Sequence, residues 1–320
     1  MDKVRNTSMY EHLEYLDDRC ELRCICGSSR GIAFRRRDRY ALKFNFKLCA
    51  KCGHVRAANP LSESASRRFY TSSDYRSLYF PGESTESVLR RKTPLPNTRS
   101  GLLRYAERLN VGPGKIVEWG CGGGWNLIPF RDAGWDVMGF DFDRTYINLG
   151  REMLGLRLFE IGDGIDPASV ISSPDVVLIN HVIEHVLQPD ETFRQLRELC
   201  TEETVVIVGV PLLETIGIWH WRDFFHVAHI HYFSRRTFLK VAADAGFSVI
   251  DQSVSDGLFA LKRSADTPSR SISRFGLVES ALLLWKGFLE PRFRIRRTIS
   301  YLLRRLGLIG VVKRLRRNLS

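Results

Sequence analysis

Short apolar runs alternate with helix-length amphipathic segments through the middle of the chain. Five of these runs predict buried strands: 115–118, 135–141, 156–161, 175–180 and 204–210. A predicted helix over 127–133 ends at Gly134, and another runs from the capping residue Ser234 to Ala245. Runs 247–250 and 258–261 form a closing hairpin. This alternation predicts βαβ units and a doubly wound, mostly parallel α/β sheet.

The first run ends at Glu118 and leads into a glycine turn, which reads Gly120-Cys121-Gly122-Gly123-Gly124. A turn without side chains lets a ligand approach the backbone closely. The dinucleotide fingerprint G-x-G-x-x-G requires a third glycine, which packs helix on strand. Trp125 and Leu127 occupy the two positions where that glycine would fall. The spacing therefore argues against a dinucleotide.

Other polar residues follow the carboxyl ends of the later runs, where ligands of such sheets bind. Asp141 lies about 20 residues after Glu118. At that distance a doubly wound sheet presents a carboxylate that accepts hydrogen bonds from the ribose hydroxyls of a nucleoside. Asp143 is predicted to cap the helix that begins near Thr145. The fourth run ends at Asn180 and continues into His181-Val182-Ile183-Glu184-His185. Together with Glu118, and with Asp163 after the third run, these residues place polar groups at four strand ends on one edge of the predicted sheet.

The turn from Glu118 to Gly124 resembles motif I of class I S-adenosylmethionine-dependent methyltransferases, and the segment 181–185 resembles the post-strand motif of that superfamily. The resemblance implies a seven-stranded sheet and S-adenosylmethionine as cofactor. Asp163 would lie near the adenine amino group, although an Asp between two glycines also suits a turn. The expected cofactor contacts are Glu118, Gly120, Cys121, Gly122, Gly124, Asp141, Phe142, Asp163, Asn180 and His181. An NAD-dependent oxidoreductase on a similar sheet is the alternative.

Histidines and tyrosines supply the candidates for acid–base chemistry. Methyl transfer from a sulfonium is an in-line displacement, so the protein mainly positions donor and acceptor. A hydroxyl or carbon acid also needs a base with a near-neutral pKa, which histidine provides. We favour His181, with His185, His226 and Tyr75 as further candidates. A metal held by His226, His229 and His231 lacks a matching carboxylate pattern.

Five of the seven cysteines lie between positions 20 and 52. The sequence Cys49-Ala50-Lys51-Cys52-Gly53 has the form of a zinc knuckle. The upstream half is less regular, because Arg23 stands where the partner of Cys26 is expected. We predict a structural zinc on Cys24, Cys26, Cys49 and Cys52, with Cys20 or His54 as substitutes. Free thiols in a reducing cytosol are the alternative.

A zinc ribbon ahead of such a core resembles sugar C-methyltransferases and their relatives in surface-glycan and natural-product pathways. In those relatives a tyrosine-rich segment, here containing Tyr70, Tyr75 and Tyr79, closes over the acceptor. The resemblance implies a sugar, nucleotide sugar or surface-glycan acceptor. The expected domains are a ribbon (1–58), a connecting segment (59–97), the core (98–262), and a linker with basic amphipathic helices (263–320). A nonenzymatic zinc-ribbon adaptor is a further alternative.

Positive charge is concentrated at the end of the chain. The formal net charge is +12, and residues 291–320 hold ten Lys or Arg and no Asp or Glu, which leaves +2 (12 − 10) for the rest. A basic amphipathic helix favours an anionic membrane surface, with packing on a protein or nucleic acid as less favoured alternatives. Residues 1–16 lack the pattern of a signal peptide. We expect a cytoplasmic protein, peripheral on the inner membrane face; the oligomeric state is not specified.

Overall fold

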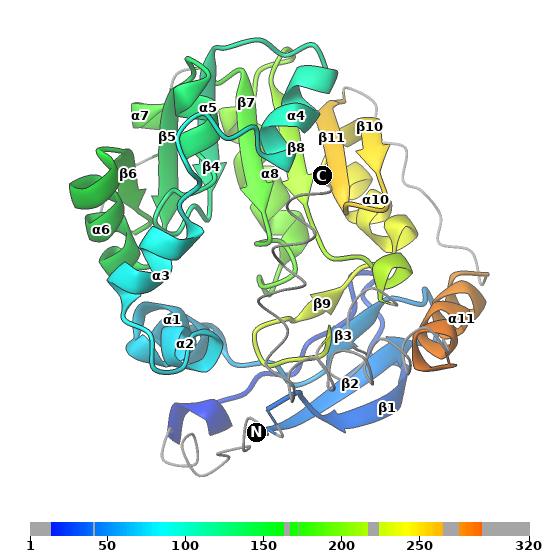
Figure 1. Cartoon of the computed structure of the whole chain (residues 1–320). Helices are drawn as coiled ribbons and strands as arrows, with labels where there is room; N and C mark the ends of the chain where they lie inside the picture. Colours follow the sequence, from blue (N-terminus) through cyan, green and yellow to red (C-terminus); the bar gives the residue numbers. More distant parts are fainter. Residues whose placement is uncertain are drawn as a thin grey trace.

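The computed structural model describes residues 14–40, 42–162, 167–171, 173–216, 224–264 and 275–289. Figure 1 shows a large sheet in the upper part of the molecule and a smaller sheet below it. The strands of the large sheet are β4 (Lys115–Trp119), β5 (Asp136–Asp141), β6 (Arg157–Glu160), β7 (Val176–Asn180), β8 (Val205–Gly209), β10 (Phe247–Ser253) and β11 (Leu258–Arg263). Their order in the sheet is β10-β11-β8-β7-β4-β5-β6.

Six strands of this sheet run in one direction, and β11 alone runs opposite to them. Strand β4 pairs in parallel with β5 and β7, β5 with β6, and β7 with β8. Strand β11 is antiparallel to both β8 and β10. Strands β7 and β8 are almost wholly buried, which explains their uninterrupted apolar sequences. The predicted mostly parallel, seven-stranded α/β sheet is confirmed.

The helices that flank the large sheet are α4 (Gly101–Arg108), α5 (Ile128–Asp132), α6 (Arg144–Leu154), α7 (Pro167–Val170), α8 (Pro189–Leu199) and α10 (Arg235–Asp244). The two predicted caps are present: Asp143 accepts from the backbone of α6, and Ser234 forms a capping box with α10. Helix α5 is only five residues long, shorter than the predicted 127–133, because the chain turns through 125–127 before it begins.

The smaller sheet contains β1 (Gly31–Arg37), β2 (Lys43–Cys49), β3 (Val55–Ala57) and β9 (His231–Tyr232), in that order and all antiparallel. Strand β9 follows β8 in the chain, yet it pairs with β3 rather than with the large sheet. Aromatic side chains from both segments share one core, in which Phe46 contacts Phe225 and Tyr232. The segment after β8 is therefore built into the cysteine-rich module.

Three connecting helices, α1 (Glu63–Thr71), α2 (Ser73–Tyr79) and α3 (Thr85–Lys92), lie on the left of Figure 1, beneath α6. An ion pair between Arg76 and Asp143 fastens α2 to the start of α6. Helix α11 (Phe275–Leu289) packs against β2. Among the described residues, none of the helices has the length and apolar character that crossing a membrane requires. The basic tail, 291–320, lies outside the described residues.

Candidate active site

The glycine turn forms at the carboxyl end of β4 and is held by β5. Phe140 O accepts hydrogen bonds from the backbone N–H groups of Gly120 (2.7 Å) and Cys121 (3.0 Å). Gly122 has φ of +55°, a conformation that side-chain-bearing residues rarely adopt, and a Cβ there would lie 2.6 Å from the Trp125 ring. The Cys121 side chain is buried. The turn is thus fixed by its backbone.

Glu118 lies beneath the turn as a fully buried carboxylate. Asn126 Nδ2 donates to Glu118 Oε1 over 2.7 Å, whereas Oε2 has no hydrogen-bond partner among the described residues. Burial, together with the nearby charge of Asp141, raises the pKa of Glu118 to about 8. A buried oxygen without a donor is a position where a ligand's cationic group would be stabilised.

Asp141 ends β5 and connects the glycine turn to the start of α6. Its Oδ2 accepts from the N–H of Gly122 (2.7 Å), and its Oδ1 accepts from the N–H of Asp143 (2.8 Å). Burial raises the pKa of Asp141 above its ordinary value. Each carboxylate oxygen retains a second lone pair, so both oxygens can still accept from vicinal hydroxyls.

Helix α3 covers the glycine turn from the side of the connecting segment. The Nζ of Lys92 lies 4.2 Å from the centre of the Trp125 ring and 5.0 Å from that of Phe80. Burial lowers the pKa of Lys92 to about 8, with Arg91 contributing. No ion pair joins Lys92 to an acid in the described part of the chain. An anionic ligand group beside the turn would therefore meet an available cation.

A cluster of histidines surrounds Glu184 beyond the end of β7. Glu184 is fully buried, and its Oε1 lies 3.2 Å from His181 Nδ1, 3.7 Å from His185 Nε2 and 3.9 Å from His229 Nε2. Burial lowers the pKa of His181, but the hydrogen bond and charge of Glu184 outweigh it and raise that pKa above its ordinary value. Burial lowers the pKa of His185 and His229. The cluster therefore combines His181, whose imidazole is more basic than usual, with His185 and His229, whose imidazoles are less basic than usual.

Tyrosines of the connecting helices close this cluster. Tyr70 Oη lies 2.9 Å from His185 Nδ1, and Tyr79 Oη lies 3.1 Å from His226 Nδ1. The Tyr75 ring packs between those of Tyr70 (5.1 Å) and Tyr79 (4.7 Å). Burial, with a smaller contribution from the charge of Asp141, raises the pKa of Tyr75 above its ordinary value. The predicted residues Tyr75, His181, His185 and His226 are thus brought to one region.

A family model described as a methyltransferase domain matches residues 91–252, half of the chain, including the glycine turn and the His181–His185 segment. The chain belongs to this methyltransferase family. The expected enzyme class, an S-adenosylmethionine-dependent methyltransferase, is confirmed. A search of curated proteins finds no match.

Solved structures of similar fold are distant from this chain in sequence. Magnesium protoporphyrin IX methyltransferase from Synechocystis, solved with bound SAH, is 18% identical with a TM-score of 0.45, over 63% of this chain and 100% of that one. The methyltransferase that the Haloferax volcanii structure describes as putative, in complex with the activator Trm112, is 16% identical with a TM-score of 0.44. The match covers 66% of this chain and 91% of that one. CalS10, an amino pentose methyltransferase from Micromonospora echinaspora, is 14% identical with a TM-score of 0.41, over 57% and 98%.

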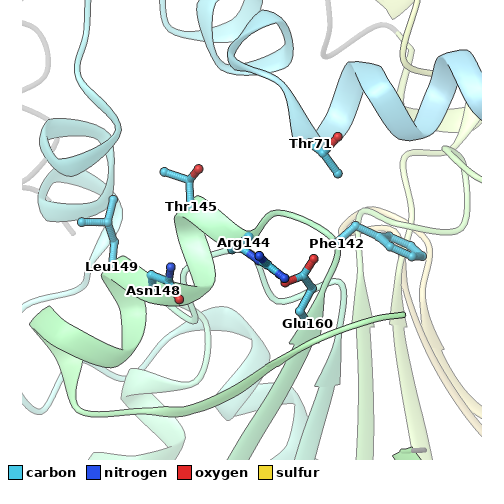
Figure 2. A pocket seen from close by; sticks show the side chains of 7 residues that line it. All are labelled: Thr71, Phe142, Arg144, Thr145, Asn148, Leu149 and Glu160. Carbon is cyan, nitrogen blue, oxygen red and sulfur yellow. The ribbon is translucent and has the colours of Figure 1, made fainter. Parts of the chain in front are cut away.

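The methyltransferase also has a pocket beside the expected cofactor region (Figure 2). Its volume is about 590 Å³, and it lies along α6 and the end of β6. It is lined by Thr71, Phe142, Arg144, Thr145, Asn148, Leu149 and Glu160. Of these only Phe142 belongs to the predicted cofactor set. Arg144 and Glu160 are paired across it, with Nε and Oε2 2.6 Å apart.

Two other predicted cofactor contacts are Asn180 and Asp163. Asn180 ends β7 beside Gly209 of β8, close enough that a Cβ at residue 209 would collide with the Asn180 side chain. Asn180 lies at the carboxyl end of β7, and its contact with the cofactor stays a prediction. Asp163 lies outside the described residues, so the predicted adenine contact stays a prediction.

The four predicted zinc ligands gather at one point of the smaller sheet. The Sγ atoms of Cys24 and Cys52 are 3.4 Å apart and those of Cys26 and Cys49 are 3.7 Å apart, and all four lie within 4.8 Å of one another. Four thiolates bound tetrahedrally to one zinc at about 2.3 Å are spaced by roughly 3.8 Å. The substitutes lie elsewhere: Cys20 Sγ is near Leu61 O, and His54 Nε2 is 2.9 Å from His231.

Three residues beside the glycine turn or in the histidine cluster were not among the predicted site residues: Tyr70, Lys92 and His229. The sequence predicted that the tyrosine-rich segment, which contains Tyr70, lies near the acceptor. It did not predict that the Tyr70 hydroxyl contacts the histidine cluster. His229 reaches Glu184 only because β9 pairs with β3, and because Glu184 O accepts from the N–H groups of Ile230 (2.8 Å) and His231 (3.0 Å). No local sequence pattern reveals that long-range pairing.

Proposed function

We propose that this methyltransferase transfers the methyl group of S-adenosylmethionine to a sugar, nucleotide sugar or surface-glycan intermediate. The observation that carries the proposal is that Tyr70 and Tyr79 contact His185 and His226 beyond the end of β7, where Val182 packs against Gly120 of the glycine turn. This arrangement supports a donor site and a hydroxyl-rich acceptor site that meet above β4 and β7. Phenol and imidazole groups can each donate or accept hydrogen bonds, which suits a polyhydroxylated acceptor.

The described residues fit the cofactor's polar groups. The free Oε2 of Glu118 is suited to the ammonium group, Lys92 to the carboxylate, and Asp141 to the ribose hydroxyls. The glycine turn admits the cofactor because it carries no side chains at the points of closest approach. When bound, the cofactor supplies an electrophilic methyl on its sulfonium.

His181 is the base that this arrangement favours. Its Nδ1 is held by Glu184, and the carboxylate raises the pKa of His181, as the acid of a catalytic dyad does. With Nδ1 occupied, Nε2 is the atom available to take a proton from an acceptor hydroxyl or acidic C–H. The tyrosines would orient the acceptor and exclude water from the site.

Methyl transfer to a panel of nucleotide sugars and lipid-linked sugars, with radiolabelled S-adenosylmethionine, tests the proposal. We expect at least one sugar acceptor to be labelled, and His181→Ala to lower kcat by about 10²–10⁴-fold with little effect on cofactor affinity. Labelling confined to nucleic acid, protein or non-sugar small molecules would refute the acceptor class. An undiminished kcat in His181→Ala would refute the base.

The four cysteines support a structural zinc that stabilises the smaller sheet. Cys49 ends β2, Cys52 lies between β2 and β3, and Cys24 and Cys26 precede β1, so the ion would cross-link these three segments. Closed tetrahedral coordination by four thiolates leaves no position for a substrate. We therefore assign this metal a structural role. Elemental analysis of the purified protein tests it, with a bound zinc expected and its loss expected in Cys52→Ser.

A further inference from the structure

We propose that Glu184, His185 and His229 form a second metal site, which binds a divalent transition ion such as Zn²⁺, Fe²⁺ or Co²⁺ within the acceptor region. The three residues offer one carboxylate oxygen and two imidazole nitrogens that all lie within 4.8 Å of one another. Two histidines and one glutamate are a recurrent ligand set of catalytic zinc, and two histidines with a carboxylate also bind Fe²⁺.

The tautomer of His185 directs a lone pair at Glu184. The Nδ1 of His185 lies 2.7 Å from Ala228 O and 2.9 Å from Tyr70 Oη. A proton on Nδ1 satisfies both contacts, because the carbonyl can only accept and the hydroxyl can accept as well as donate. In the neutral ring, Nε2 is then an acceptor, and it faces Glu184 Oε1 at 3.7 Å. Two acceptors in this geometry repel one another unless a cation lies between them. A backbone carbonyl on the outer nitrogen is also how metal-binding histidines are usually oriented.

His229 extends the same arrangement. Its Nε2 lies 3.9 Å from Glu184 Oε1, too far for a hydrogen bond, and its Nδ1 has no partner among the described residues. Two donors bound at about 2.0–2.1 Å to one tetrahedral zinc lie roughly 3.4 Å apart, so small side-chain movements would complete the site. The ring of His226 packs 3.8 Å from that of His229 and supports it without belonging to the ligand set.

The charge of Glu184 gives a second reason for a cation. This carboxylate is fully buried, and no lysine or arginine pairs with it in the described part of the chain. Its Oε2 has no hydrogen-bond partner there either. A buried carboxylate with one unsatisfied oxygen is costly, and a divalent ion would relieve that cost. The hydrogen bond from His181 to Oε1 leaves a lone pair on each oxygen for the metal.

The site is accessible from one side. The side chains of His185 and His229 retain 17% and 14% of their surface exposed, whereas Glu184 retains none. An ion would therefore enter past the imidazoles and keep a coordination position directed away from Glu184. That position would suit an oxygen atom of the acceptor, as in catalytic sites with three protein ligands. This role toward the acceptor rests on the proposed methyl transfer, whereas metal binding itself does not.

Cobalt binding to the full-length protein distinguishes this site from the cysteines. Co²⁺ on thiolates produces an intense charge-transfer absorption, which Co²⁺ on imidazole and carboxylate lacks. After equilibrium dialysis, we expect the wild type to retain one Co²⁺ per chain beyond the thiolate-bound ion. His229→Gln and Glu184→Gln should each lose that additional ion and keep the thiolate absorption, which also reports that the variant is folded.

His226→Gln is the matched control, because His226 contacts His229 but is not a ligand, and it should retain the additional ion. His185→Gln tests the site from a second segment of the chain and should lose it. The proposal is overturned if the wild type holds only thiolate-bound Co²⁺ at saturating metal. It is equally overturned if the folded His229→Gln and Glu184→Gln variants retain the same amount as the wild type.

Discussion

Gly122 shows how closely the donor site depends on one residue. Its φ of +55° is unfavourable for other residues, and any Cβ would press against the Trp125 ring at 2.6 Å. Its N–H also donates to Asp141, so a displaced turn would lose its hydrogen bond to that carboxylate. The glycine spacing was readable in the sequence because each of these constraints acts within a few residues.

Gly122→Val should weaken binding of S-adenosylhomocysteine by at least about 100-fold, roughly 3 kcal/mol, without changing the zinc content. Calorimetry and elemental analysis measure the two effects. Gly155→Val is the matched control: Gly155 has a similar φ of +64°, but a Cβ there meets nothing within 4 Å. Loss of zinc together with cofactor binding in Gly122→Val would indicate global unfolding and contradict the local explanation.

Glu118 should make the stability of the cofactor-free protein depend on pH. Its pKa is about 8 in the folded protein and 4.5 in its ordinary state, so the folded state binds more protons between these values. The free energy of unfolding should therefore fall as pH rises from about 4.5 to 8, by up to about 1.4 kcal/mol per unit of pH.

Glu118→Gln removes this titration, so its stability relative to the wild type should rise across that pH range. Denaturant unfolding at several pH values measures the difference. The exposed Glu203 provides the control variant Glu203→Gln, which should follow the wild type. A constant difference between Glu118→Gln and the wild type would contradict the assigned pKa.

At the scale of elements, the large sheet was predictable and the smaller sheet only partly so. Strands buried on both faces leave apolar runs that stand out in the sequence, as in β7 and β8. Strand β9 has two residues and no periodicity, and its partner β3 lies about 175 residues away in the chain. His229 joins the histidine cluster through that pairing, so His181, His185 and His226 were predicted singly, whereas His229 and the grouping were not.

The pairing of β3 with β9 predicts that the cysteine site supports methyl transfer. Cys52→Ser, or removal of the thiolate-bound zinc, should lower kcat at least about tenfold, because β9 anchors the segment that holds His229 beside Glu184. Affinity for S-adenosylhomocysteine should stay within about twofold. Steady-state kinetics and calorimetry measure the two quantities.

Cys20→Ser is the control for this coupling, since Cys20 lies outside the four-cysteine group and its Sγ contacts Leu61 O. It should retain both activity and zinc. An unchanged kcat in zinc-free protein would show that the smaller sheet is independent of the active site. A parallel loss of cofactor affinity would show that the whole fold had been disrupted.

For the whole molecule, membrane binding by the basic amphipathic tail is a prediction from the sequence alone. Residues 291–320 hold ten of the basic residues and lie outside the described part of the chain. The full chain should sediment with vesicles that contain anionic lipid, and binding should weaken as salt rises. A chain ending at residue 290 should remain in the supernatant and bind cofactor normally. Equal sedimentation of both chains, or none of either, would contradict a membrane-binding tail.

The central claim, that the turn from Glu118 to Gly124 together with Asp141 forms a methyl-donor site, is tested most directly by calorimetric titration of the full chain. S-adenosylhomocysteine and NAD are titrated separately into the same protein. We predict saturable binding of S-adenosylhomocysteine at one site per chain and no measurable binding of NAD, because Trp125 and Leu127 interrupt the dinucleotide fingerprint. Tight binding of NAD without binding of S-adenosylhomocysteine would contradict the account.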